Sequence, residues 1–263
     1  MAATNLLQGK TAIITGGVTG IGRAIALEYI RQGANVVVNH LGLERDKPHL
    51  TSLLSEAEAI RPGVLDHQPG DVTDAATGKS LVQHAVSRFG RLDICVSNAG
   101  ICQFAEFLTL DADLFSRTVR TNLDGAFYVV QAAARQMASQ APPGGAIIGI
   151  SSISALVGGG MQTHYTPTKA GVLSLMQSCA VALGKHRIRC NALLPGTVRT
   201  QLNEEDLADD AKRSYMEGRI PLGRTGLPHD LAGPAVFLAC EELSGYVTGA
   251  QLLVDGGLFV NLQ

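Results

Sequence analysis

The sequence has no excess of basic residues, no long apolar run and no signal-peptide pattern. Its 21 lysines and arginines stand against 23 acidic residues, for a formal net charge of −2. Nothing in that balance attracts the chain as a whole to nucleic acid. No run approaches the length that spans a bilayer, and the start MAATNLLQGK lacks the features of a signal peptide. We therefore expect a cytoplasmic protein that binds small molecules, with neither nucleic acid nor a membrane as partner.

Paired cysteine motifs are also missing. The five cysteines are odd in number and form no C-x-x-C pair, which argues against a disulfide framework and against a zinc site. We expect no bound metal. No internal repeat, low-complexity segment or linker interrupts the chain. Its 263 residues, 46% of them hydrophobic, are enough to bury a large core, so a single domain is expected over residues 1–263.

A glycine-rich turn near the start joins an expected strand to an expected helix. Residues 10–15 (KTAIIT) and 35–40 (NVVVNH) read as strands, and RAIALEYIRQG between them has apolar residues at helical spacing. Gly16, Gly20 and Gly22 lie in the turn that opens this helix. Such a unit brings backbone N–H groups and a helix N-terminus up to a pyrophosphate. The placement favours phosphate binding over a purely structural turn.

The alternation of strands and helices continues to the end of the chain. It predicts an α/β fold, namely a Rossmann-like doubly wound parallel sheet flanked by helices on both faces. In such sheets the ligand binds at the carboxyl ends of the strands, where the strand order reverses.

The stretch from Ile148 to Ala170 holds a second set of candidate residues. Tyr165 stands four residues before Lys169, and Ser152 follows an apolar run that ends at Ile150. On a helix the first two share a face, so the ammonium is expected to lie beneath the phenol and to lower its pKa. The tyrosine could then exchange a proton with an alcohol or carbonyl that the serine holds. Taken alone, Tyr-x-x-x-Lys is also compatible with an ordinary surface pair.

The motifs together resemble the short-chain dehydrogenase/reductase family. Its Thr-Gly-x-x-x-Gly-x-Gly motif is matched by residues 15–22, and residues 97–100 (SNAG) stand where the family has Asn-Asn-Ala-Gly. The resemblance implies hydride transfer between a substrate carbon and C4 of a nicotinamide. The cofactor-binding residues that it implies are Gly16, Thr19, Gly20, Ile21, Gly22, His40, Asp71, Val72, Asn98, Gly100, Tyr165, Lys169, Pro195, Gly196, Thr197 and Val198.

The same resemblance implies a catalytic tetrad. Tyr165 would handle the proton, Lys169 would tune it and hold the ribose, and Ser152 would steady the reacting oxygen. Asn122 matches the family's helix asparagine, which supports a water linked to the lysine.

The residue after the second strand bears on cofactor choice. NAD-specific relatives often carry an Asp there, whereas this chain has His40 preceded by Asn39. No acid excludes a 2′-phosphate, and Thr19 fills a position that is often basic in NADP-dependent members. We expect use of NAD, with NADP accepted as well.

A closer resemblance points to the sugar-oxidising members of the family. It is carried by SSISALVGG, THYTPTKAG, LSLMQSCAVALG and LLVDGGLFVNLQ, and it implies oxidation of a sugar hemiacetal at C1 to a lactone. Polar side chains could read ring hydroxyls, and an aromatic one could cover an apolar part of the sugar. The substrate residues expected are Ser152, Ser154, Gln162, Tyr165, Phe104 and Asn203. For Ser154, Gln162, Asn203 and Phe104, ordinary loop polarity or packing is the alternative.

Other functions remain open at this point. A carbonyl or 3-oxoacyl-thioester reductase would use the same tetrad in reverse. A nucleotide-sensing protein would keep the glycine turn without catalysis, and the intact tetrad argues against it.

Two further regions carry expectations about assembly and substrate access. Pro167 requires the helix around Lys169 to begin close to Thr163, and this helix is apolar nearly all round. With the apolar tail at residues 258–262, it predicts a homotetramer. Residues 201–219 resemble the family's mobile substrate lid, with a solvated pair of short helices as the alternative.

Overall fold

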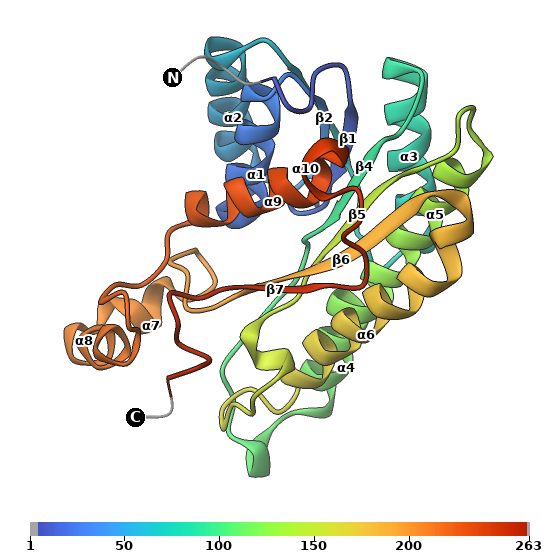
Figure 1. Ribbon diagram of the computed structural model, residues 1–263. Coiled ribbons are helices and arrows are strands. Elements are labelled where there is room, and N and C mark those ends of the chain that lie inside the picture. The colour runs from blue at the N-terminus through green and yellow to red at the C-terminus, as the bar shows by residue number, and fades with distance from the viewer. Residues whose placement is uncertain (1–4, 262–263) are drawn as a thin grey trace.

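Seven strands form one parallel sheet in the order β3-β2-β1-β4-β5-β6-β7 (Figure 1). The computed structural model describes residues 5–261, apart from the side chains of residues 205 and 206. The order reverses between β1 and β4, which confirms the predicted Rossmann-like doubly wound sheet. The strands are β1 Thr11–Ile14, β2 Asn35–His40, β3 Val64–Pro69, β4 Ile94–Ser97, β5 Gly145–Ile150, β6 Ile188–Pro195 and β7 Gln251–Val254.

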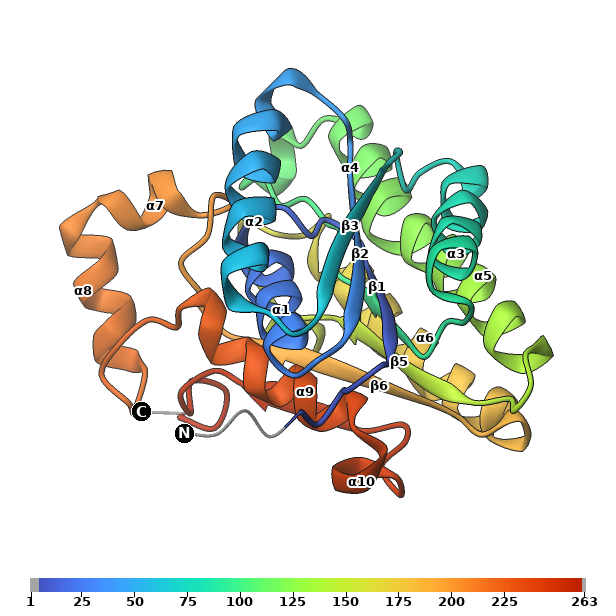
Figure 2. The same cartoon turned by 90° about the horizontal axis from the view of Figure 1, so that it is seen from above.

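Helices cover both faces of the sheet (Figure 2). One face carries α1 (Gly20–Arg31), α2 (Lys47–Ile60) and α9 (Ala232–Ala239), followed by the short α10 (Glu241–Ser244). The other face carries α3 (Ala75–Phe89), α5 (Gly125–Ser139) and α6 (Thr166–Leu183), with α4 (Ala112–Val119) leading into α5. Within residues 5–261, no helix combines the length and the apolar character needed to cross a membrane.

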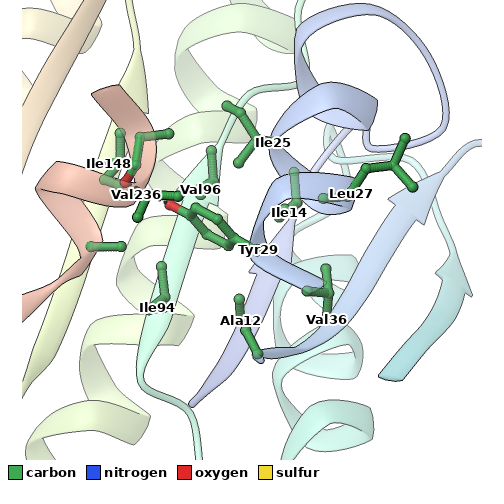
Figure 3. Close-up of a cluster of buried hydrophobic side chains, with 14 of the residues drawn as sticks. Ala12, Ile14, Ile25, Leu27, Tyr29, Val36, Ile94, Val96, Ile148 and Val236 are labelled. Atoms are coloured by element: carbon green, nitrogen blue, oxygen red, sulfur yellow. Dashed lines mark hydrogen bonds between the residues drawn. The ribbon is translucent and has the colours of Figure 1, made fainter. Parts of the chain in front are cut away.

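Neighbouring residues of one strand pack in two separate hydrophobic clusters, one on each face of the sheet. In β1, Ile14 packs in the cluster beneath α1 and α9, whereas Ile13 packs in the cluster beneath α3, α5 and α6. Burial on both faces explains why the strands read as nearly continuous apolar runs. In the first cluster Tyr29 is fully buried, and its hydroxyl donates to the Ala235 carbonyl at 3.0 Å (Figure 3). This contact fixes α1, whose first turn carries the glycine motif, against α9.

The start of α6 differs from the prediction. The helix begins at Thr166, not near Thr163, with Pro167 in its first turn and Tyr165 as its N-cap. The preceding residues form a turn in which the Gln162 carbonyl accepts from the N–H groups of Tyr165 and Thr166, both at 2.9 Å. This turn satisfies two N–H groups at the start of the helix, where the helix itself offers no partner, and the proline ring sits where it disturbs no helical bond.

The charged stretch at residues 201–219 folds into two short helices, as its pattern predicted. These are α7 (Glu204–Ala208) and α8 (Asp210–Arg219), which stand apart from the sheet in both ribbon views (Figures 1 and 2).

Candidate active site

Glycine is favoured at three positions of the turn between β1 and α1, two by their backbone conformation and one by the lack of space for a side chain. Gly16 has φ +61° and Gly20 has φ +54°, in the left-handed region that other residues rarely adopt. A Cβ on Gly22 would lie 2.5 Å from the Gly16 carbonyl oxygen and 2.6 Å from Asn98 Nδ2. Thr19 is the N-cap of α1, and Ile21 lies in its first turn. The turn thus leaves the positive end of the helix uncovered by side chains, a cradle that fits a pyrophosphate.

Asn98 braces this turn against the neighbouring strand. Its Nδ2 donates to the carbonyls of Thr15 at 2.8 Å and Gly16 at 3.1 Å. The Thr15 hydroxyl accepts in return from the N–H groups of Asn98 at 2.9 Å and Ala99 at 3.0 Å. These four bonds join β1 to β4 at the point where the strand order reverses. Asn98 therefore holds the shape of the turn, and its amide hydrogens already have protein partners.

A cavity of about 510 Å³ separates the glycine turn from α7. It is lined by Gly20, Arg199, Thr200, Gln201, Asn203, Glu204, Leu207, Ala208 and Pro228. A second hollow, of about 430 Å³ between α3 and α5, contains none of the predicted site residues. The first cavity borders the glycine turn at Gly20, where a bound dinucleotide would begin.

Ser152, Tyr165 and Lys169 come together at the carboxyl end of β5. The Lys169 ammonium is buried, lies 5.5 Å from the centroid of the Tyr165 ring and donates to the Ile150 carbonyl at 2.9 Å. Ser152 hydrogen-bonds the phenol of Tyr165, and its hydroxyl accepts from the Ser154 N–H at 3.1 Å. This arrangement can hold an oxygen between a serine and a tyrosine above a lysine cation.

Burial dominates the acid–base properties of this group in the free chain. It raises the pKa of Tyr165 above its ordinary value, and the hydrogen bond from Ser152 offsets only part of that rise. The expected lowering of the pKa of Tyr165 was therefore wrong, because desolvation by burial raises it. Burial also lowers the pKa of Lys169 to about 8.

Asn122 connects three parts of the site. It lies in a π-helical segment, Arg120–Asp124, between α4 and α5, an irregularity that is frequent at functional sites. Its side chain exchanges two hydrogen bonds with the backbone of Ile101, at 2.8 and 2.9 Å, and donates to the Thr168 hydroxyl at 3.2 Å. A Cβ on Gly100 would lie 3.2 Å from Asn122 Oδ1 and 3.5 Å from Lys169 Nζ. Gly100 thus permits the close approach of the lysine and the asparagine.

The predicted substrate residues lie on loops, and their surroundings differ. Phe104 is 42% exposed. Asn203 closes a turn of the lid, because its Nδ2 donates to the Val198 carbonyl at 2.9 Å and its Oδ1 accepts from the Thr200 N–H at 2.9 Å. Its amide thus has two backbone partners and keeps one N–H hydrogen and one oxygen lone pair for a further contact.

Cys102 is a residue of this site that sequence reasoning missed. Its sulfur accepts from Gln162 Nε2 at 3.3 Å. A charge on the Cys102 thiol would raise the pKa of Tyr165, and the charge of Lys169 acts to lower the pKa of the thiol, against the effect of burial. The three side chains are therefore close enough to interact. Its position two residues after Gly100, which the family resemblance already assigned to cofactor binding, was the available signal.

His40 ends β2 as an uncharged side chain. Its Nε2 lies 3.2 Å from His67 Nδ1, and its own Nδ1 accepts from the Gly42 N–H at 3.0 Å. Burial lowers the pKa of His40, with the neighbouring His67 adding to the effect and Asp46 opposing it. The imidazole therefore brings neither a negative charge that would exclude a 2′-phosphate nor a positive charge that would bind one.

The other predicted cofactor residues lie at the same edge of the sheet. Asp71 is exposed and accepts from the Thr73 N–H at 2.9 Å, while Val72 is buried against Gly125. At the end of β6 a Cβ on Gly196 would lie 2.6 Å from Asp255 Cβ. The remaining residues of that loop are Pro195, which ends β6, Thr197, whose carbonyl accepts from the Gly226 N–H at 2.9 Å, and Val198, which is buried.

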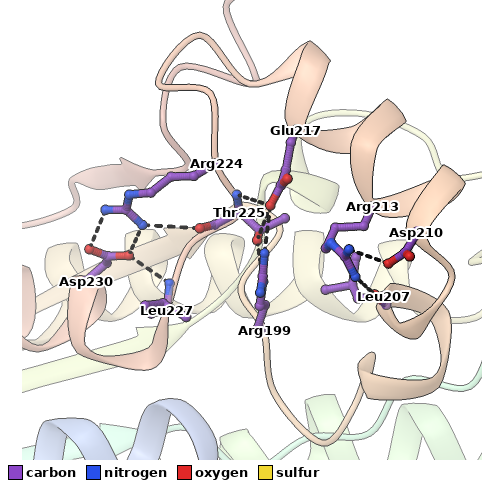
Figure 4. Close-up of polar contacts among 9 residues, drawn as sticks. All are labelled: Arg199, Leu207, Asp210, Arg213, Glu217, Arg224, Thr225, Leu227 and Asp230. Atoms are coloured by element: carbon purple, nitrogen blue, oxygen red, sulfur yellow. Dashed lines mark hydrogen bonds and ion pairs between the residues drawn. The ribbon is translucent and has the colours of Figure 1, made fainter.

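Ion pairs lie around residues 201–219 (Figure 4). Arg199 donates to Glu217 Oε1 and to the Thr225 hydroxyl, both at 2.7 Å. Arg224 bonds both carboxylate oxygens of Asp230, at 2.7 and 2.9 Å. The first pair ties α8 to the loop that follows β6, and the second lies in the segment after α8.

Comparisons with known proteins agree with this geometry. Residues 16–259 match a family model described as enoyl-(acyl carrier protein) reductase. The chain is 62% identical over 260 residues to an L-rhamnose-1-dehydrogenase of Scheffersomyces stipitis, covering 99% of this chain and 100% of that protein. It is 58% identical to an L-rhamnose 1-dehydrogenase (NAD(P)(+)) of Azotobacter vinelandii, covering 98% and 100%. A crystal structure of a gluconate 5-dehydrogenase from Burkholderia cenocepacia, in complex with NADP and tartrate, superposes with a TM-score of 0.88 at 32% identity, covering 99% of each chain.

Proposed function

The chain belongs to the short-chain dehydrogenase/reductase family, and from this premise we propose that it oxidises L-rhamnose at C1 to L-rhamnono-lactone with NAD or NADP. The observation that carries the proposal is the identity of 62% and 58% to two proteins of that name, over 98% or more of this chain. The assembled Ser152, Tyr165 and Lys169 supply the chemistry that the reaction needs. We take residues 1–263 to act as one domain.

The proposed reaction removes a proton from the C1 hydroxyl and a hydride from C1. Bound NAD or NADP supplies the hydride acceptor at C4 of its nicotinamide. Tyr165 takes the hydroxyl proton as the C1 carbonyl forms, and Ser152 holds the same oxygen by a hydrogen bond. The positive charge that Lys169 carries below its pKa of about 8 favours the phenolate in that step. Asn122 holds the loop after β4 and α6 in register around the lysine.

The cradle between β1 and α1 fits the pyrophosphate of a dinucleotide. Its three glycines leave the helix N-terminus open, and Asn98 maintains that shape. The Pro195–Val198 loop would face the nicotinamide, and Asp71 and Val72 the adenine. His40 carries no charge at neutral pH that selects between the cofactors. We therefore propose use of both NAD and NADP, in line with the names of the Azotobacter relative and of a 42% identical L-rhamnose 1-dehydrogenase (NADP(+)) from Thermoplasma acidophilum.

L-Rhamnose has a methyl group at C6 and hydroxyls around its ring. We propose that Phe104 covers the methyl group and that Ser154 and Gln162 read hydroxyls, beside the contacts of Ser152 and Tyr165 at C1. Asn203 would both shape the turn before α7, through its bonds to the backbone of Thr200 and Val198, and offer its remaining N–H hydrogen and oxygen lone pair to the sugar.

A reductase of acyl thioesters is the second candidate function. It is favoured by the description of the matching family model and by 37% identity to a 3-oxoacyl-[acyl-carrier-protein] reductase of Thermotoga maritima over 97% of this chain. A screen of sugars with both oxidised cofactors, run beside acetoacetyl thioesters with both reduced cofactors, separates the two. Turnover of thioesters at a higher kcat/KM than any sugar would reject L-rhamnose as the substrate.

We also propose a cytoplasmic homotetramer. Val181, on the outer face of α6, is 88% exposed, and Val260 of the tail is 72% exposed; the tail residue Leu262 lies outside the described residues. Apolar surface of this kind is better covered by a second copy. All five cysteines are free thiols, as is usual in a reducing compartment. Light scattering that reports a monomer at micromolar concentration would reject the tetramer.

A further inference from the structure

Two loops meet beside the catalytic tyrosine through one pair of side chains. Gln162 Nε2 donates to Cys102 Sγ at 3.3 Å, which joins the turn before α6 to the loop after β4. A backbone hydrogen bond from Ala105 to the Met161 carbonyl, at 3.0 Å, joins the same two loops. The Gln162 carbonyl also accepts from the N–H of Tyr165 at 2.9 Å. The side chain of Gln162 is therefore anchored one turn away from the reacting tyrosine.

The carboxamide of Gln162 is held from a second side by Gly159. A Cβ at Gly159 would lie 2.6 Å from Gln162 Oε1 and 3.2 Å from Gln162 Cβ. The amide thus rests directly on the glycine backbone. The neighbouring Gly158 and Gly160 face open space, with nothing within 4 Å of a Cβ at either position. Of these three consecutive glycines, Gly159 is the one whose missing side chain makes room for Gln162.

This arrangement leaves one polar atom of Gln162 available. One N–H of its Nε2 donates to Cys102, while its Oε1 accepts no hydrogen bond from any residue in the described part of the chain and is not fully buried. An unrestrained carboxamide turns freely about its last torsion and can present either oxygen or nitrogen. The contact with Cys102 removes that choice.

We propose that Cys102 is a positioning residue for substrate recognition: it orients Gln162 so that the carboxamide oxygen accepts a hydrogen bond from a ring hydroxyl of the sugar. This inference rests on the proposed oxidation of a sugar at this site. Cys102 acts through Gln162 and takes no part in the proton or hydride transfer. Burial raises the pKa of the thiol, which keeps it neutral beside Tyr165. A site built to bond a substrate hydroxyl discriminates strongly against analogues that lack it.

A double-mutant cycle tests the proposal with L-rhamnose and NAD. Cys102→Ala is expected to raise the KM for L-rhamnose about three- to tenfold, the effect of one net hydrogen bond, with kcat and the KM for NAD within about twofold. Cys102→Ser keeps an acceptor at this position and should restore most of the affinity. In a Gln162→Ala background, Cys102→Ala should have no further effect, because the residue that it orients is gone.

Gly159→Ala tests the role of the Gln162 carboxamide without changing Cys102, and Gly158→Ala is its matched control. A methyl group on Gly159 must displace the carboxamide, so it should raise the KM for L-rhamnose as Cys102→Ala does, whereas Gly158→Ala should leave it unchanged. Equal effects of Cys102→Ala with and without Gln162, or equal KM values for the two glycine variants, would overturn the proposal. If the wild type oxidises L-rhamnose and Cys102→Ala has the same KM for it, this role alone is contradicted. If the wild type oxidises no sugar, the proposed function and this role are contradicted together.

Discussion

The cofactor end and the substrate end of the site are held together in different ways. At the cofactor end, the glycine turn fits against Asn98 and Thr15 through backbone atoms and the absence of side chains at Gly16 and Gly22. At the substrate end, side chains from loops and from α8 meet in contacts such as Gln162 with Cys102 and Arg199 with Glu217. The first arrangement tolerates almost no substitution, whereas the second can change its recognition one side chain at a time.

The largest expected effect lies where the two ends meet. Tyr165→Phe removes only the ionisable hydroxyl, so turnover should fall by about 10²- to 10⁴-fold while the dissociation constant of NAD stays nearly unchanged. Steady-state kinetics and calorimetric titration with NAD measure the two quantities. Tyr246→Phe, which alters a fully exposed tyrosine, is the control and should have wild-type turnover. If Tyr165→Phe keeps more than a tenth of the activity, another group is the acid–base.

The cofactor end should be sensitive to a single methyl group. Gly22→Ala places a Cβ 2.5 Å from the Gly16 carbonyl oxygen, and overpacking of this kind costs about 1–3 kcal/mol of unfolding free energy. The variant should also bind NAD more weakly, because the turn must open. Gly218→Ala makes the same change in α8, where nothing lies within 4 Å of the new Cβ, and should be neutral or stabilising. Urea unfolding and NAD titration of both variants decide this; equal behaviour of the two would disprove the close fit.

A smaller and more selective effect is expected at the substrate end. If Phe104 covers the C6 methyl group, Phe104→Ala should reduce the preference for L-rhamnose over L-lyxose, which lacks that group. One apolar contact of this kind is worth about 1–3 kcal/mol, and the comparison of kcat/KM for the two sugars in each protein measures it. A ratio that stays the same in the variant would show that Phe104 only packs the loop.

The smallest effect is expected in the ion pair between Arg224 and Asp230. The hydrogen bonds from Arg224 lower the pKa of Asp230 from 3.8 to about 2. A lowered folded-state pKa means that the pair stabilises the fold above about pH 4 and loses this contribution as the pH falls toward 2. Because the pair is largely exposed, its contribution should stay below about 1 kcal/mol.

Asp230→Asn should therefore unfold more easily than the wild type at pH 6, with the difference shrinking at pH 3. Glu58→Gln, which breaks an exposed pair with Arg61 at the end of α2, is the control. A difference for Asp230→Asn that grows as the pH falls would contradict the assigned direction.

The same contrast explains how far the sequence alone could be interpreted. The turn with Gly16, Gly20 and Gly22 could be predicted because backbone geometry leaves no other residue type there. The proximity of Ser152, Tyr165 and Lys169 could be predicted from the spacing of these residues in the sequence. The pairing of Cys102 with Gln162 could not, because it joins two loops that are 60 residues apart.

Two further predictions depended on local physics that a motif does not carry. The pKa of Tyr165 was expected to be lowered, but the degree of burial that raises it is a property of the folded chain and not of a motif. The contact of Asn203 with the sugar stays a prediction, because its amide closes a turn through the backbone of Val198 and Thr200 and keeps one hydrogen and one lone pair. A polar residue in a loop has the same appearance in a sequence whether its partner is a ligand or the chain itself.

The central claim is that hydride leaves C1 of L-rhamnose. L-Rhamnose deuterated at C1 can be incubated with NAD and the purified chain, and the products analysed by proton NMR and mass spectrometry. Our account predicts deuterium at C4 of the reduced nicotinamide and a lactone product that carries none. Reduced cofactor without deuterium, or no reduced cofactor from L-rhamnose at all, would contradict it.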